Sequence, residues 1–309
     1  MSIVLGPNQY GKAENRVVRI YRDTDRHEIR DLNVSTSLSG DFTAAHVDGD
    51  QSAVLPTDTQ KNTAFAFAKE HGISSPEDYA LALAAQFLDA ASAATGARIE
   101  VEEYAWDRIP VRGKGHDHAF VRRGGDIRTT VVTMEQAGAT RRAWVVSGLQ
   151  DLVVLKSTGS QFAGFLRDRY TTLPEADDRI LATSLVARWR YACTDVPGGD
   201  WTATFEGVRQ ILLETFATTY SRALQQSLYA MGSAVLQAHP EIAEIRFSAP
   251  NKHHLLVDLS PFGVENPGEV FLAADRPYGL IEATVTRDDA PDAEDAWLTT
   301  PGPRQKGVT

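Results

Sequence analysis

The chain has 309 residues, of which 42% are hydrophobic and 23% are charged, and this composition is typical of globular proteins. Its length allows one large domain or two moderate ones, and either would bury an ample hydrophobic core. The formal net charge of −10 argues against a nucleic-acid partner, because phosphate binding needs a concentrated basic face. With one cysteine, Cys193, no disulfide can form within the chain, which fits a reducing compartment.

The sequence carries no recognisable membrane or export segment. No apolar run approaches the roughly 20 residues that a spanning helix needs, and the first ten residues lack the layout of a signal peptide. The last four residues, KGVT, are not a peroxisomal Ser-Lys-Leu type address. We therefore expect a cytoplasmic protein with no membrane partner. Residues 288–309 are acidic and then rich in Pro and Gly, so we expect a flexible C-terminal tail there.

The first half of the chain predicts two strands, two helices and two further strands. Partial alternation of β-branched residues indicates a hairpin, apolar residues at helical spacing indicate the helices, and a period of two then returns. Ser75 and Pro76 are typical of the N-cap and first position of the second helix. In chain order the segments are 16–21, 27–38, 59–70, 76–94, 99–106 and 129–134.

The second half repeats this order without clear identity at the level of residues. Its segments are strands 144–155 and 187–192, helices 202–218 and 221–239, and strands 244–248, 253–259 and 280–286, with a shorter strand near Val270. Two such units predict an α+β fold, an antiparallel sheet with its helices on one face. We place the units at 1–137 and 138–287. The open edges and uncovered face of such a sheet are usually resolved by assembly.

The segment 156–183, KSTGSQFAGFLRDRYTTLPEADDRILAT, mixes aromatic side chains with charges and hydroxyls. A disordered linker would be poor in aromatics, so we interpret this segment as a binding loop. Phe162 offers a flat apolar face and Arg179 a planar fork of donors, which together suit a planar, anionic, heteroaromatic ligand. The alternative is that Phe162 is core and that Arg179 forms a surface ion pair with Asp177 or Asp178.

Other polar residues fit either a site or an ordinary structural role. Thr57 and Asp58 precede a helix, whose unpaired N–H groups favour an anion, but Thr57, Asp58 or Thr59 would equally serve as the N-cap. Lys12 alone is typical of a surface lysine, and Gln225 of a solvated helix residue.

Two histidine clusters raise the question of a metal. His253 and His254 are adjacent in a strand context, where neighbours point to opposite faces, so they rarely bind one ion. If residues 116–118 form a strand, His116 and His118 share one of its faces, but they lack an evident third ligand.

The segment 156–183 closely resembles the corresponding segment of the urate oxidase (uricase) family, from LKSTGSQF through GFLRDRYTTL to DRILAT. Four further motifs resemble this family in the same order: YGK at 10–12, TDTQKNT at 57–63, LQQSLY at 224–229 and PNKHH at 250–254. The resemblance spans nearly the whole chain. It implies two tandem tunnelling-fold (T-fold) units, whose sheets join between subunits into barrels, and a homotetramer of two stacked barrels.

The resemblance also assigns roles to particular residues. It implies a proton relay of Lys12, Thr57 and His253. Thr57 and Asp58 would come from a neighbouring subunit, so that each site lies at a subunit interface. The implied substrate-binding residues are Thr57, Asp58, Phe162, Arg179, Leu224, Gln225 and Asn251.

Within that set, Phe162 would stack beneath the purine, while Arg179 and the carboxamide of Gln225 grip its rim. Leu224 would contribute a backbone N–H; the family often has Val there, and we expect little loss because the backbone is used. Asn251 with Thr57 would hold dioxygen or a water above the ring.

The implied activity is cofactor-free oxidation of urate by dioxygen and water to 5-hydroxyisourate and hydrogen peroxide, in purine degradation. The sequence has neither a GxGxxG motif after a strand nor a cysteine cluster. Two alternatives stay open: a T-fold zinc hydrolase or pterin enzyme using His116, His118 and Cys193, and a non-catalytic purine-binding protein.

Overall fold

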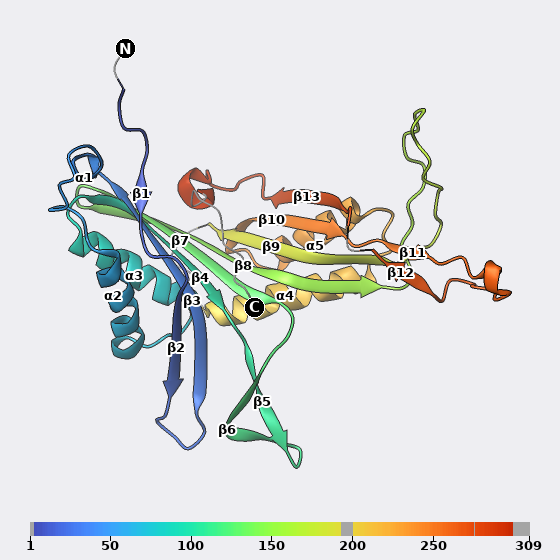
Figure 1. Ribbon diagram of the computed structural model, residues 1–309, viewed down its shortest axis with the longest axis horizontal. Helices are drawn as coiled ribbons and strands as arrows, with labels where there is room; N and C mark the ends of the chain where they lie inside the picture. Colours follow the sequence, from blue (N-terminus) through green and yellow to red (C-terminus); the bar gives the residue numbers. More distant parts are fainter. Residues whose placement is uncertain (1–2, 193–199, 275, 299–309) are drawn as a thin grey trace. The chain divides into compact units, whose positions relative to one another are not determined.

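The computed structural model describes residues 3–192, 200–274 and 276–298, so Cys193 and residues 299–309 of the expected tail lie outside the described residues (Figure 1). The chain divides into two units. The first comprises Met1–Arg123, Thr129–Val146 and Pro291–Thr309, and the second comprises Gly124–Arg128 and Ser147–Ala290. Within the described residues, no helix is both long and apolar enough to cross a membrane.

The first unit is an antiparallel sheet with a pair of helices. Its strands follow the order β1-β3-β4-β7, with β2 paired to β3, and α3 packs on β4 while α2 packs on α3 and β2. A separate hairpin is formed by β5 and β6. The elements are β1 (Gln9–Tyr10), β2 (Asn15–Tyr21), β3 (Glu28–Gly40), α1 (Thr43–Val47), α2 (Thr57–Glu70), α3 (Pro76–Ala90), β4 (Ala94–Glu103), β5 (Trp106–Val111), β6 (Lys114–Arg122), β7 (Ile127–Ala137) and β8 (Thr140–Lys156), whose second half enters the other unit.

The predicted start of α3 is confirmed, and its predicted end is wrong. The Ser75 hydroxyl accepts a hydrogen bond from the backbone N–H of Asp78 at 3.0 Å, and Pro76 opens the helix. The alanine-rich run favours helix to 94, but the helix ends at Ala90. Ala94 instead pairs with Gly40 as the first residue of β4, so sheet pairing overrides the local helix propensity.

The second unit has the same α+β character, which confirms the predicted fold class. Its sheet order is β8-β9-β10-β13, and α5 packs on β10, β13 and α4. At Gly232 of α5 an added Cβ would lie 2.6 Å from the Val285 side chain, so only glycine allows this close approach of helix and sheet. The elements are β9 (Leu181–Tyr191), α4 (Trp201–Thr218), α5 (Leu224–Ala238), β10 (Ile242–Asn251), β11 (His254–Leu256), η1 (Ser260–Phe262), β12 (Phe271–Ala273) and β13 (Gly279–Thr286).

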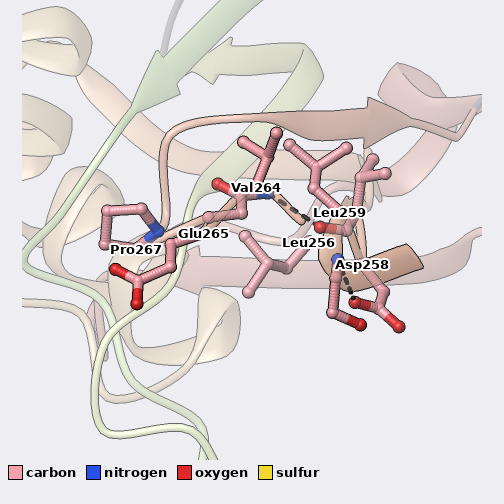
Figure 2. A pocket seen from close by; sticks show the side chains of 9 residues that line it. Leu256, Asp258, Leu259, Val264, Glu265 and Pro267 are labelled. Carbon is pink, nitrogen blue, oxygen red and sulfur yellow. Dashed lines mark hydrogen bonds between the residues drawn. The ribbon is translucent and has the colours of Figure 1, made fainter. Parts of the chain in front are cut away.

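The strand predicted over 253–259 is shorter than expected. β11 ends at Leu256 and pairs with the short β12, and residues 257–259 lead without strand structure into a 3-10 turn at Ser260–Phe262. The segment that connects β11 to β12 forms an open pocket of about 460 Å³ lined by Leu256, Leu259 and Val264 (Figure 2). Asp258 and Glu265 also line it, and two carboxylates do not suit an anionic ligand.

The start of the C-terminal region is packed in the first unit. A 3-10 turn, η2 (Glu294–Trp297), buries Ala296 in a small cluster with Val131 and Val146. Beside it, Glu135 of β7 lies against Asp295, and a hydrogen bond with that carboxyl, followed by burial, raises the pKa of Glu135 to about 7. Arg142, which pairs with Glu294, opposes this rise.

We predict that this contact makes the first unit less stable as the pH rises. The pKa of Glu135 is higher in the folded chain than its ordinary value of 4.5, so the folded state binds the proton more tightly. The stabilisation is full below pH 4.5 and is lost as the pH rises to about 7. Glu135→Gln should therefore flatten the fall in Tm across this window, measured by thermal unfolding at several pH values. The exposed Glu70→Gln is the control, and a slope equal to that of the wild type in Glu135→Gln would contradict the assignment.

Candidate active site

Backbone hydrogen bonds fold the segment between β8 and β9 against the connection from α4 to α5. Ser160 forms a parallel bridge with Ser221, whose N–H donates to the carbonyl of Gly159 at 2.9 Å. The Gln161 N–H donates to the Ser221 carbonyl at 2.8 Å. The Ser221 hydroxyl lies 2.7 Å from that of Ser227 in α5. The beginning of the predicted binding loop is thereby fixed to the beginning of α5.

A partly buried lysine supports the same connection. The Lys156 ammonium donates to the carbonyl of Thr219 at 2.5 Å and to that of Phe216 at 3.4 Å, just after and at the end of α4. Cations are favourable at this end of a helix. Burial lowers the pKa of Lys156.

Arg179 and Phe162, which the sequence predicted as partners, lie together. The Arg179 N–H donates to the Ser160 carbonyl at 2.7 Å, and Phe162 exchanges two backbone hydrogen bonds with Ala176 at 2.8 and 3.0 Å. These bonds place the Arg179 Cζ 5.0 Å from the centroid of the Phe162 ring. The Phe162 ring also stacks on Phe165, with centroids 5.0 Å apart and planes 15° from parallel.

The ion-pair alternative for Arg179 is wrong within the part of the chain that the structure describes. The Asp178 carboxylate turns back to accept from the Thr158 hydroxyl at 2.5 Å and the Ser160 N–H at 3.2 Å. The Arg179 Nε is buried without a hydrogen-bond partner among the described residues, and burial lowers the pKa of Arg179. A partly desolvated cation that forms no ion pair with a described carboxylate favours an anionic ligand.

The start of α5 adds uncapped donors. Its N-cap is Ala223, which makes no side-chain cap hydrogen bond, so the first N–H groups of the helix favour an anion. Leu224 is buried, with 2% exposure, whereas Gln225 is exposed. The buried Leu224 side chain therefore anchors the start of α5, and the exposed Gln225 carboxamide lies next to it.

Asn251 and His253 lie where β10 ends. Asn251 pairs with Thr183 of β9 on one side and Gly279 of β13 on the other. The carbonyl of His253 accepts from the Ala274 N–H at 2.9 Å, which fixes the turn into β11. Phe162, Arg179, Leu224, Gln225, Asn251 and His253 are called the second-unit set below.

Lys12, Thr57 and Asp58 form the first-unit set. An added Cβ at Gly11 would lie 1.7 Å from the Thr36 carbonyl oxygen, so only glycine lets this segment approach β3. Lys12 then donates its N–H to the Thr36 hydroxyl at 3.1 Å and accepts the Thr36 N–H at 2.8 Å. That hydroxyl donates to Gln60 Oε1 of α2 at 2.6 Å, which ties the Lys12 segment to the helix that begins at Thr57.

The capping alternative for residues 57–59 is wrong. Pro56 occupies the N-cap position and no side chain caps the helix, so the N–H groups at its start are not satisfied in this way. The Asp58 carboxylate accepts from Lys61 and, at 3.0 Å, from Asn62. The bond from Lys61 contributes most to lowering the pKa of Asp58, and the charge of Lys12 contributes too.

The histidines of β6 do not form a metal centre with other described residues. The His116 and His118 rings are perpendicular, with centroids 4.5 Å apart. In the ranges that the structure describes, no group of three His, Cys, Asp or Glu side chains is arranged to hold a metal ion. Cys193, the third member of that hypothesis, lies outside the described residues.

Several supporting residues were missed by the sequence analysis. Thr36 reads as an ordinary strand residue, and its bond to Gln60 joins positions 24 residues apart, which spacing does not reveal. Gln60 and Ser160 do fall within the two motifs TDTQKNT and KSTGSQF, so the motifs themselves carried the signal.

Known proteins are similar to this chain along most of its length. The family model described as Uricase matches residues 8–133 and 145–282. A uricase from Arthrobacter globiformis is 52% identical over 300 residues, covering 97% of this chain and 95% of the relative. A uricase from Schizosaccharomyces pombe is 36% identical, covering 90% and 96%. The crystal structure of uricase from Arthrobacter globiformis has a TM-score of 0.89 at 51% identity, covering 96% of this chain and 99% of that one.

Proposed function

The chain belongs to the uricase family, and we propose that it oxidises urate with dioxygen and water to 5-hydroxyisourate and hydrogen peroxide. The observation that carries the proposal is the partly buried Arg179 guanidinium, which lies beside an aromatic ring and has no carboxylate partner in the described chain. A flat anion could stack on the Phe162 ring and accept hydrogen bonds from the Arg179 guanidinium, so it would suit both side chains. Urate is such an anion.

In this proposal the second-unit set, apart from His253, binds the purine. Arg179 and Gln225 hold its rim, the N–H of Leu224 adds a donor at the start of α5, and Asn251 faces the oxidant. The urate anion supplies the electrons, so the protein needs only to position urate and dioxygen and to move protons. The proposed reaction uses no metal, flavin or haem.

The first-unit set completes the proposed site from a neighbouring subunit. Thr57 and the Asp58 backbone would contact urate, and Lys12, Thr57 and His253 would relay protons. This arrangement requires an interface between subunits, and the assembly in this proposal is a homotetramer of chains built from T-fold units at 1–137 and 138–287. The cytoplasmic location stays a prediction, as does the flexibility of the C-terminal tail beyond the packed turn at Glu294–Trp297.

The reaction is tested by adding urate to metal-free protein with and without dioxygen. We expect the ultraviolet absorbance of urate to fall with equimolar peroxide in air, and to stay constant under argon. Activity that survives strong chelation would eliminate the zinc hydrolase. A protein that binds urate and leaves its absorbance unchanged in air would instead be a purine-binding protein.

Replacing Arg179 should lower kcat/KM more than replacing Phe162. Two charge-assisted hydrogen bonds contribute roughly 1.5–3 kcal/mol each, whereas stacking adds about 0.5–1.5 kcal/mol beyond area burial. We expect Arg179→Ala to lower kcat/KM about a hundredfold or more and Phe162→Leu about tenfold or less. Arg167→Ala, which removes an exposed arginine of the same loop, is the control. Comparable losses for the first two variants would refute this order.

Mixed oligomers test whether each site draws on two chains. Thr57→Ala damages the first-unit set and Arg179→Ala damages the second, so each variant alone should be nearly inactive. Co-expressed, the two variants should recover activity, because some sites receive both intact sets. Arg179→Ala with Gln225→Ala is the matched control: both changes affect the second-unit set, so every site keeps one defect. If the first pair recovers no more activity than this control, both sets come from one chain.

A further inference from the structure

Gln60 lies in the first turn of α2 with its side chain buried, although glutamine is among the residues that usually face solvent. Its exposure is 0%. The carboxamide oxygen accepts a hydrogen bond from the Thr36 hydroxyl at 2.6 Å, and the carboxamide nitrogen donates to the Leu55 carbonyl at 3.3 Å. A leucine would fill a similar volume without burying polar atoms, so these two bonds are what glutamine adds here.

Tyr10 also binds the backbone of Leu55. The Leu55 N–H donates to the Tyr10 hydroxyl at 2.9 Å. The Tyr10 ring lies edge-on to Phe42, with centroids 4.8 Å apart and planes 87° from parallel. Leu55 belongs to no helix or strand, and side chains bind both polar groups of its backbone. The chain just before α2 is therefore fixed by two residues from other parts of the first unit's sequence.

Together these bonds close a ring around the segments that carry Lys12 and Thr57. The tyrosine lies two residues before Lys12, and the leucine lies two residues before Thr57. The Lys12 backbone exchanges two bonds with Thr36, at 3.1 and 2.8 Å, and the Thr36 hydroxyl returns the ring to α2 through Gln60. Each segment is thus held at two points, so neither can shift past the other without breaking a hydrogen bond.

Electrostatics also place the Lys12 side chain near the start of α2. The bond from Lys61 contributes most to the lowered pKa of Asp58, and the positive charge of Lys12 adds to it. Exposed charges act on each other only over short distances in salt solution. The Lys12 ammonium therefore lies within electrostatic reach of the residue that follows Thr57.

We propose that Tyr10 and Gln60 are positioning residues for the proton relay. They hold Lys12 and Thr57 at a fixed separation, so that one chain supplies both to the relay as a preassembled pair. This inference rests on the proposed function, in which Lys12 and Thr57 pass protons. Transfer through a hydroxyl requires the donor and acceptor atoms to stay within hydrogen-bond distance, about 2.6–3.2 Å. The whole ring lies within the first unit, so the pair needs no second chain to form.

The same substitution at two tyrosines tests this role. Tyr10→Phe removes the hydroxyl that binds Leu55 and keeps the ring beside Phe42. Tyr79→Phe is the matched control, because the Tyr79 hydroxyl donates to the Ala64 carbonyl of the same helix at 2.6 Å, beyond its first turn. We expect Tyr10→Phe to lower kcat about tenfold and to raise the solvent deuterium isotope effect on kcat, because proton transfer becomes slower. Tyr79→Phe should lower Tm and leave both kinetic quantities unchanged.

Gln60→Met tests the other side of the ring. Methionine is similar in length to glutamine but lacks the carboxamide that makes both bonds. We expect kcat to fall about tenfold again, with the Kd of urate under argon within about threefold of the wild type, because most proposed urate contacts belong to the second-unit set. Thr36→Val should act in the same way, and Thr36→Ser, which keeps the hydroxyl, should recover most of the activity.

Two results would overturn the inference. One is a wild-type kcat and isotope effect in Tyr10→Phe or Gln60→Met. The other is a loss of kcat that Tyr79→Phe matches or that an equal loss of urate binding accompanies, since general damage to the first unit would explain either. If Gln60→Met does not fold, Tyr10→Phe decides the question alone.

The wild-type assay separates this inference from the proposed function. A wild type that leaves urate unoxidised refutes the proposed function itself. An active wild type with unaltered kinetics in Tyr10→Phe and Gln60→Met refutes only the positioning role.

Discussion

The partly buried guanidinium of Arg179 is the charge on which the candidate site of the second unit depends. Burial disfavours its cationic form, and the two aspartates that precede it in the sequence do not neutralise it. Asp178 is occupied instead by Thr158 and the Ser160 N–H. The same carboxylate that would have cancelled the charge thus shapes the loop that presents it, and the cation remains available to an anion from outside the chain.

Support for this charge comes from connections distant in sequence. The bridge between Ser160 and Ser221 joins the binding loop to the start of α5, and Lys156 holds the end of α4 just before that bridge. In the first unit, Thr36 joins the Lys12 segment to α2 through Gln60. Each set of candidate residues therefore sits on backbone that a second element holds in place, which catalytic positioning requires.

Much of the fold could be predicted from local pattern, and the remainder shows where pattern fails. Ser75 and Pro76 predicted the start of α3 correctly because helix capping is an interaction between residues close in sequence. The end of that helix was predicted wrongly because Ala94 pairs in the sheet with Gly40, which is distant in the sequence. The hairpin of β5 and β6 was missed because its strands are largely polar and half exposed, and so show no strong apolar alternation.

The candidate site divides in the same way. Phe162 and Arg179 were recognisable as a pair from their chemistry, and motif resemblance supplied the others. Whether Arg179 is neutralised could not be predicted, because Asp177 and Asp178 stand beside it in the sequence and only the fold turns Asp178 elsewhere.

Gly11 has a consequence for how this protein can vary. Because the Thr36 carbonyl occupies the volume where any side chain would begin, the residue beside Lys12 has no smaller or larger substitute that preserves the local backbone. Substitutions that change the surroundings of Lys12 without moving its backbone therefore have to lie in β3, which faces Gly11, or in α2. Directed evolution of the proposed proton relay would therefore be more productive at Thr36 and Gln60 than within residues 10–12, which contain Lys12.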